Sequence, residues 1–218
     1  LVLNKENLDE RVLYNLNIKK YKKANLKKWR EISNLQKNPK NSISIGIIGK
    51  YIELKDAYKS LSEALYHSGI HNSTEIKIIW INAEKSINVK SSLKNLNGIL
   101  VPGGFGKRGI LGKISSIKFA RENNIPFLGI CFGMQLAVIE YAQNVINIKN
   151  ASSSEFKIKN AVNIIGIMTE WIKDGKNVKR TITTDYGGSM RLGSYKCILQ
   201  NKSLIRRIYT VSYTHLTL

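Results

Sequence analysis

The sequence predicts an α/β fold, with a doubly wound and mainly parallel sheet covered by helices on both faces. Two observations support this prediction. Between residues 43 and 145, short apolar runs rich in β-branched residues alternate with amphipathic helical patterns, as expected of parallel strands joined by crossover helices. Glycine-rich segments follow two of the expected strands, and parallel sheets bind ligands at the carboxyl ends of their strands.

Four strands and three helices are expected in this region. Each strand is a short apolar run, and each helix carries apolar residues at spacings of three and four. Asp56 at the start of the first helix suits the positive end of the helix dipole. The expected strands are 43–48, 76–81, 98–101 and 126–130, and the expected helices are 56–67, 114–122 and 135–145.

The two ends of the chain differ from this central region. Residues 1–42 lack glycine and contain two helical patterns, one around Leu8 to Leu16 and a weaker one around Leu26 to Ile32. Residues 37–42 are typical of a linker. Beyond residue 160 the alternation weakens, with a strand expected at 163–168 and a glycine-containing excursion at 179–194.

Composition excludes several classes of protein. With 35 Lys+Arg against 15 Asp+Glu, the net charge is +20. It is spread as +7, +6 and +7 over 1–42, 43–150 and 151–218, without a zinc finger or an aromatic RNA-binding motif, so we expect no nucleic-acid site. Two cysteines exclude a disulfide framework. No long apolar run or signal peptide is present, which favours a cytoplasmic protein without membrane contact. The first residue is not Met, so a piece of a longer protein is expected.

The strongest chemical signal is the run Gly129-Ile130-Cys131-Phe132-Gly133, between an apolar strand and a helix. A nucleophile on such a tight turn adopts strained backbone angles, and its close neighbours must be glycine to avoid clashes. The start of the following helix is a favourable place for a thiolate. The alternative is that Cys131 is an inert buried residue.

A second signal is the run Val101-Pro102-Gly103-Gly104-Phe105-Gly106, which also follows a strand. Its glycines allow backbone N–H groups to turn toward a substrate oxygen, as an acyl-transfer site requires. A phosphate loop is the alternative, but the lysine-containing pattern of such loops is missing. A plain tight turn is the simplest interpretation of this run taken alone.

Together these runs resemble the class I glutamine amidotransferase domain of the CTP synthase family, which has a flavodoxin-like fold. The resemblance extends from residue 1 to about residue 209. By this resemblance, residues 1–42 are the end of a synthase domain and its linker, 43–209 are the amidotransferase domain, and 210–218 are a non-matching tail. The matching runs are IGIIGKYIELKDAYKSLSEAL, ILVPGGFGKRGILGKI, ARENNIPFLGICFGMQLAVIEYA, NASSSEF, MTEW and GGSMRLGSYKC.

The resemblance implies roles for individual residues. Cys131 is expected to attack the carboxamide of glutamine and form a γ-glutamyl thioester. The backbone N–H groups of Gly104 and Phe132 are expected to form the oxyanion hole. The glutamine site would consist of Phe132, Gly133, Met134, Gln135 and Glu155, and a mobile lid linked to GTP activation would span 180–192.

The resemblance also implies partners outside this chain. Ammonia is expected to pass to the synthase domain and attack UTP phosphorylated by ATP, giving CTP. ATP and Mg²⁺ belong to that domain, so no cofactor is expected here. GTP is the expected activator, and the full-length enzyme is expected to be a homo-oligomer.

One departure from the family concerns the base that activates the thiol. The family has histidines before an Arg-Tyr-Glu run near its C-terminus, and the final residues here, 210–218, do not match it. His215 lacks the family's neighbours, and His67 and His71 do not follow the end of a strand. We therefore expect an incomplete catalytic triad and little glutaminase activity.

Three other interpretations remain open. The chain could be an inactive amidotransferase-like module for assembly or regulation, a basic nucleic-acid binder, or a cysteine hydrolase of the α/β-hydrolase type. Glutamine-dependent thioester formation on Cys131 distinguishes the favoured interpretation from the first, and a steep salt dependence of DNA binding would support the second.

Overall fold

The computed structural model describes residues 1–50, 52–85, 89–166, 170–173, 176–179, 194–210 and 213–217. It divides into two compact units, residues 1–166 and 167–218, which are considered separately. The expected lid at 180–192 lies outside the described residues. The domain boundaries at residues 42 and 209 stay predictions.

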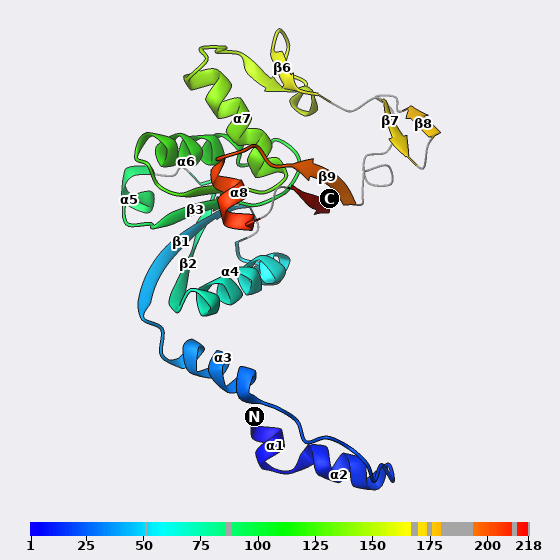
Figure 1. Ribbon diagram of the computed structural model, residues 1–218. Helices are drawn as coiled ribbons and strands as arrows, with labels where there is room; N and C mark the ends of the chain where they lie inside the picture. Colours follow the sequence, from blue (N-terminus) through cyan, green and yellow to red (C-terminus); the bar gives the residue numbers. More distant parts are fainter. Residues whose placement is uncertain are drawn as a thin grey trace. The chain divides into compact units, whose positions relative to one another are not determined.

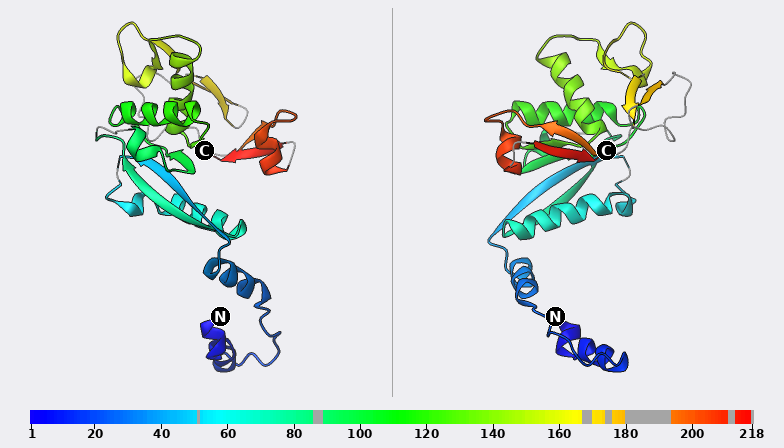
Figure 2. Two further views of the ribbon diagram at one scale, coloured as in Figure 1. Left: turned by 90° about the vertical axis from the view of Figure 1, so that its left-hand side faces the viewer. Right: turned by 45° about the vertical axis from the view of Figure 1, so that its right-hand side comes forward.

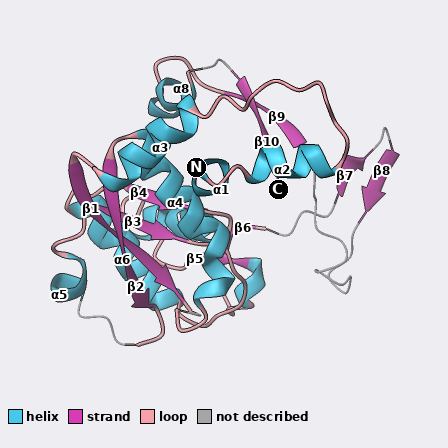
Figure 3. Ribbon diagram, turned by 90° about the horizontal axis from the view of Figure 1, so that it is seen from below, coloured by secondary structure: helices cyan, strands magenta, loops and turns pink. Residues whose placement is uncertain are grey.

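The first unit contains a parallel four-stranded sheet in the order β2-β1-β3-β4 (Figures 1 and 3). From β1 the chain moves outward to β2 and then returns past β1 to β3, so the winding reverses between β1 and β3. In such sheets this reversal opens a crevice at the carboxyl ends of the two strands. Lys50 follows β1 and Pro102 follows β3 at this point. The strands are β1 (Asn41–Gly49), β2 (Thr74–Asn82), β3 (Gly98–Val101) and β4 (Phe127–Gly129).

Helices cover both faces of the sheet (Figures 1 and 2). On one face α4 (Lys59–His71) packs so closely on β2 that a Cβ at Gly69 would lie 2.7 Å from the Ile76 side chain. On the other face, α6 (Ile110–Glu122) and α7 (Phe132–Asn144) bury the core cluster. That cluster includes Ile48, Ile81, Ile99 and Val101 from the strands and Ile117, Ala120, Leu136 and Ile139 from the helices. The doubly wound parallel fold is therefore confirmed.

An ion pair joins α6 to α7 near the core. Arg121 donates from Nη2 and Nε to the carboxylate of Glu140, at 2.8 and 3.0 Å. The Glu140 side chain is almost completely buried, so its charge is compensated where water cannot reach it. The hydrogen bonds to this carboxylate raise the pKa of Arg121. The pair fixes α7, and with it the residues at the start of this helix.

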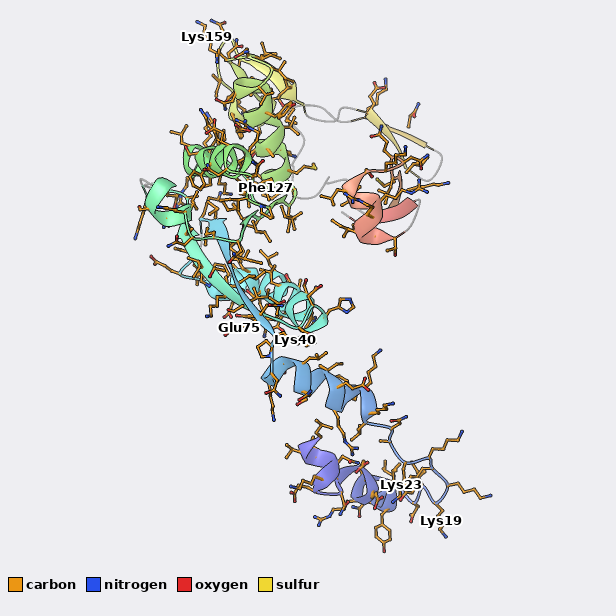
Figure 4. All side chains as sticks on the ribbon, turned by 60° about the vertical axis from the view of Figure 1, so that its left-hand side comes forward. Lys19, Lys23, Lys40, Glu75, Phe127 and Lys159 are labelled. Carbon is orange, nitrogen blue, oxygen red and sulfur yellow. The ribbon has the colours of Figure 1, made fainter. Side chains whose placement is uncertain are left out.

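The remaining elements of the first unit lie outside the sheet. At the start of the chain three helices contain no buried residue, and Lys19 and Lys23 extend from the segment between the second and third of them (Figure 4). These helices are α1 (Val2–Lys5), α2 (Leu8–Asn15) and α3 (Lys27–Lys37); the other elements are η1 (Lys55–Tyr58), α5 (Val89–Leu93), β5 (Ala151–Ser153), η2 (Ser154–Phe156) and β6 (Val162–Ile165).

In its described residues, the second unit contains two antiparallel pairs and one helix. β7 pairs with β8, and β9 pairs with β10, which places His215 opposite Lys196 in the backbone register. These elements are β7 (Glu170–Lys173), β8 (Lys176–Lys179), β9 (Ser194–Ile198), α8 (Leu204–Tyr209) and β10 (Tyr213–Thr217). Across the described ranges of both units, no helix is long and apolar enough to cross a membrane.

The four expected strands are confirmed, but two helices begin earlier than expected. α6 starts at Ile110 rather than at residue 114, and its Gly112 is a packing residue because a Cβ there would lie 2.3 Å from the Ala83 carbonyl oxygen. α7 starts at Phe132 rather than at residue 135, directly after the cysteine. The expected strand at 163–168 is β6, as far as it lies in the described residues.

Candidate active site

Cys131 lies at the junction of β4 and α7 in a strained conformation. It is the N-cap residue of α7, with φ 51° and ψ −106°, and its side chain is exposed. Residues other than glycine rarely adopt such angles, and where they do the strain is typical of functional sites. This geometry is that expected of a nucleophile elbow, which presents its side chain to solvent above the sheet.

The glycines on either side of Cys131 are required by contacts with the backbone. A Cβ at Gly129 would lie 2.6 Å from the carbonyl carbon of Gly133, and a Cβ at Gly133 would lie 2.0 Å from the carbonyl oxygen of Val101. Both distances are far shorter than any real contact, and backbone atoms cannot move aside as a flexible side chain can. The elbow is therefore a turn that only glycine permits at these two positions.

The turn after β3 lies directly beside the elbow. Val101 pairs with Gly129, and the Ile130 N–H donates to the Val101 carbonyl oxygen at 2.9 Å. A Cβ at Gly103 would lie 3.5 Å from the Cβ of Cys131. The two glycine-containing runs thus meet at the carboxyl edge of the sheet, and the turn's backbone lies within reach of a group bonded to the thiol.

Comparison with known proteins agrees with this geometry. Residues 53–216 match the family model described as glutamine amidotransferase class-I. The chain belongs to the class-I glutamine amidotransferase family.

Individual relatives add detail. The chain is 54% identical over 207 residues to a protein named CTP synthase from Pelagibacter ubique (strain HTCC1062), covering 94% of this chain and 38% of that relative. A CTP synthase from Brucella anthropi is 47% identical over 211 residues, with 96% and 39% covered. The solved glutaminase domain of Trypanosoma brucei CTPS, with bound acivicin, has a TM-score of 0.66 at 30% identity, covering 80% of this chain and 65% of that one. The chain therefore spans less than two fifths of the length of these two curated relatives.

In this amidotransferase domain, charged groups fasten the turn after β3. The Lys50 ammonium donates to the Phe105 carbonyl oxygen, and the Gly106 N–H donates to Oε1 of Glu155 at 2.7 Å. Further along, Arg108 Nη2 donates to Glu84 at 2.8 Å, and this bonding holds the pKa of Glu84 below its usual value. The turn is thus attached to the ends of β1 and β2 and to the short helix η2.

The residues predicted to bind glutamine differ in accessibility. Phe132 and Gly133 are buried, so the Phe132 side chain belongs to the core and only its backbone can face a ligand. Met134 is exposed and Gln135 is half-buried on the first turn of α7. Glu155 is half-buried, and the Ser153 hydroxyl accepts a hydrogen bond from its N–H at 3.3 Å. The structure brings Glu155 to the turn that contains Gly104; the binding roles stay predictions.

A lysine lies beneath the elbow, where sequence reasoning assigned no residue. Lys113 on α6 is 1% exposed, and its Nζ lies 5.0 Å from the centroid of the Phe132 ring. Burial, and to a lesser degree the charge of Lys50, lowers the pKa of Lys113 to about 8. Near neutral pH the core next to the elbow therefore contains a cation that is costly to keep charged.

Two of the three histidines lie far from the thiol along the fold. His67 and His71 are both on α4, which runs from the carboxyl edge of the sheet back to its amino edge and ends at His71. His67 is exposed and lies 4.0 Å from Glu63. The side chain of His215 is outside the described residues. Neither histidine of α4 is placed as a base for Cys131.

Sequence reasoning also missed Lys50. Lys50 is part of the GKY run used for the resemblance, and its position directly after β1 marks it as a residue of the carboxyl edge. Cys197, the second cysteine, lies on β9 and is half-buried. Among the described residues, no group of three or more His, Cys, Asp or Glu side chains could hold a metal ion.

Proposed function

We propose that this chain is the glutamine-hydrolysing part of a CTP synthase. The observation that carries the proposal is the strained, exposed Cys131 between two sterically required glycines, with the Gly103–Gly104 turn against it. The identity to two CTP synthases supports the choice of this enzyme among the class-I amidotransferases. Glutamine is the proposed substrate, bound through Gln135 and Glu155 with Met134 at the rim.

The proposed chemistry is acyl transfer to the thiol. Sγ of Cys131 bonds to the carboxamide carbon of glutamine, and the negative charge that develops on its oxygen is held by the N–H groups of Gly104 and Phe132. The C–N bond then breaks and the leaving nitrogen takes up the proton that the Cys131 thiol gave up. Ammonia departs, and a γ-glutamyl thioester remains on the enzyme. Water hydrolyses this thioester to glutamate and the free thiol.

The remaining steps belong to the part of the relatives that this chain does not span. We assign the binding of UTP, ATP and Mg²⁺ to that part, where ammonia attacks UTP phosphorylated by ATP. GTP as activator, a cytoplasmic location and assembly of the full-length enzyme into a homo-oligomer are proposed on the family resemblance. Of these functions, only activation by GTP is assigned to residues of this chain, namely the expected lid at 180–192.

Labelling of the two cysteines tests the proposal. Acivicin, the compound bound in the trypanosomal relative, should modify Cys131 and not Cys197, and glutamine should protect Cys131. Peptide mass spectrometry reads both sites in one sample, and Cys197→Ser is the matched control. Equal labelling of both cysteines, or labelling that glutamine does not reduce, would contradict the proposal.

A second candidate function is an amidotransferase-like module without catalysis. The observation that favours it is the position of His67 and His71 on α4, away from the elbow. We therefore expect only trace release of ammonia from glutamine, because loss of a triad base reduces turnover by several orders of magnitude. Thioester trapped on Cys131 in the presence of glutamine would favour the glutaminase; its absence would favour the module. Release at the ordinary rate of an amidotransferase would show that a base is present.

A further inference from the structure

One peptide group of the turn after β3 is held at both of its ends by charged side chains. The Lys50 ammonium donates to the carbonyl oxygen of Phe105. The next N–H along the chain, that of Gly106, donates to Oε1 of Glu155 at 2.7 Å. These two atoms belong to the same peptide unit, and no peptide bond in the described chain is cis, so the oxygen and the N–H point in opposite directions.

The arrangement of charges matches the dipole of that peptide. The negative end, the oxygen, faces a cation, and the positive end, the N–H, faces an anion. Rotation of the peptide by half a turn would place the oxygen against the carboxylate and the N–H against the ammonium, losing two charge-assisted hydrogen bonds. The charges therefore select one orientation of a peptide plane in a glycine-rich segment that steric contacts leave free. A Cβ at Gly106 would meet nothing within 4 Å.

We propose that Lys50 and Glu155 are positioning residues, which fix the Phe105–Gly106 peptide and thereby the direction of the neighbouring Gly104 N–H. This inference rests on the proposed function, in which that N–H binds the oxyanion. The chain enters the turn from β3, where pairing with β4 fixes Val101, so the orientation of the peptides beyond Gly103 depends on the far end of the turn. Lys50 and Glu155 supply that second attachment.

Glu155 would then serve two purposes with its two oxygens. Oε1 accepts from Gly106, and Oε2 is the atom left to accept from the α-ammonium group of glutamine. Substrate and turn would share one carboxylate, so binding of glutamine would bring a cation to the group that also orients the oxyanion turn. In this proposal Lys50 acts on the turn and not on the substrate.

The test uses a chloromethyl ketone analogue of glutamine on the full chain, in which the ketone carbon takes the place of the γ-carboxamide carbon. Sγ of Cys131 displaces chloride and forms a C–S bond while the ketone oxygen occupies the oxyanion site. The maximal inactivation rate, kinact, depends on how well the turn places its N–H groups around the ketone oxygen. The half-saturating concentration, KI, measures binding of the analogue. Iodoacetamide alkylation of the same thiol corrects for any change in thiolate population.

We expect Lys50→Met to lower the corrected kinact by roughly tenfold or more with KI within twofold, because a small misplacement of a catalytic group is costly. Lys50→Arg, which keeps a charged donor, should restore most of the rate. Glu155→Gln keeps an acceptor for Gly106 and should mainly raise KI, whereas Glu155→Ala should change both constants. Lys94→Met, at an exposed lysine beyond α5, is the matched control and should change neither.

Two results would be negative in different ways. If the unaltered chain shows no saturable, glutamine-protected inactivation, the proposed function fails and the inference falls with it. If the unaltered chain is inactivated normally and a folded Lys50→Met variant keeps its corrected kinact within twofold, only the inference is overturned. Should circular dichroism show that Lys50→Met does not fold, Lys50→Gln provides the same comparison with a neutral donor.

Discussion

The two glycine-containing runs at the carboxyl edge are held in place by different forces. In the elbow, Gly129 and Gly133 lie so close to backbone atoms that a Cβ would come within 2.6 and 2.0 Å of them. In the turn after β3, a Cβ at Gly103 would meet nothing nearer than 3.5 Å and one at Gly104 nothing nearer than 3.9 Å. The turn is instead fastened by Lys50, Glu155 and the Arg108–Glu84 pair.

This difference suits the proposed roles of the two runs. A nucleophile has to stay in one strained conformation, and close packing resists displacement at any pH or salt concentration. A hydrogen-bonding turn has to present N–H groups, and charged side chains orient peptide dipoles without filling the space that a ligand needs. The elbow should therefore be sensitive to volume and the turn sensitive to charge.

The largest effect is expected from adding volume to the elbow. Gly133→Ala places a Cβ 2.0 Å from the Val101 carbonyl oxygen, so either α7 or β3 has to move. We expect a loss of more than about 3 kcal/mol in the free energy of unfolding, measured by urea denaturation. A variant whose free energy of unfolding lies within about 1 kcal/mol of the parent's would show that the elbow is not packed as described.

A smaller change in the free energy of unfolding, of opposite sign, is expected when the buried charge of Lys113 beneath the elbow is removed. The pKa of Lys113 is about 8 in the folded chain against 10.5 for an ordinary lysine, so the unfolded chain binds the proton more tightly. The cost of the buried charge is fully present below pH 8, and stability should rise with pH between about 8 and 10.5 as the folded state releases the proton. At about 1.4 kcal/mol per pKa unit, this cost is on the order of 3 kcal/mol.

Lys113→Met removes the charge and keeps an unbranched chain of similar length. We expect the variant to be more stable than the parent at pH 7 by up to about 3 kcal/mol, and the gain to shrink toward pH 10. Urea denaturation at a series of pH values measures it, with Lys94→Met as an exposed control. A variant that is less stable than the parent at pH 7 would mean that the ammonium's interaction with the Phe132 ring outweighs its desolvation.

The smallest effect on stability is expected in the turn. Gly103→Ala adds a Cβ at an ordinary contact distance of 3.5 Å from the Cβ of Cys131. We expect the free energy of unfolding to change by less than about 1 kcal/mol, while the added methyl group crowds the thiol and slows its labelling by acivicin. Labelling kinetics and urea denaturation on the same preparation measure both quantities. A loss of free energy of unfolding as large as that expected for Gly133→Ala would contradict the conclusion that the elbow is sensitive to added volume and the turn is not.

Most of the sheet could be predicted from the sequence because buried parallel strands consist of uninterrupted apolar runs. The second half of β1 and all of β3 are such runs, whereas β2 includes Glu75 and Lys77 and alternates in exposure. The strand ends located the elbow and the turn. The start of α6 was missed because glycine is unfavourable inside a helix, so Gly112 suggested that the helix begins after it. In the structure Gly112 lies within α6 and allows the helix to approach Ala83. Lys50 and Lys113 were missed because their importance depends on partners 55 residues away and on burial beneath Phe132, which local patterns do not encode.

The contact between Gly133 and the Val101 carbonyl oxygen also makes Cys131 a reporter of folding. In an unfolded chain this cysteine is an ordinary flexible thiol, and its strained conformation forms only when β3 and β4 have paired and α7 has docked. Parallel pairing joins residues that are distant along the chain, so it is among the slower steps of folding. The time at which Cys131 becomes selectively reactive toward glutamine analogues during refolding would therefore mark the completion of this side of the sheet.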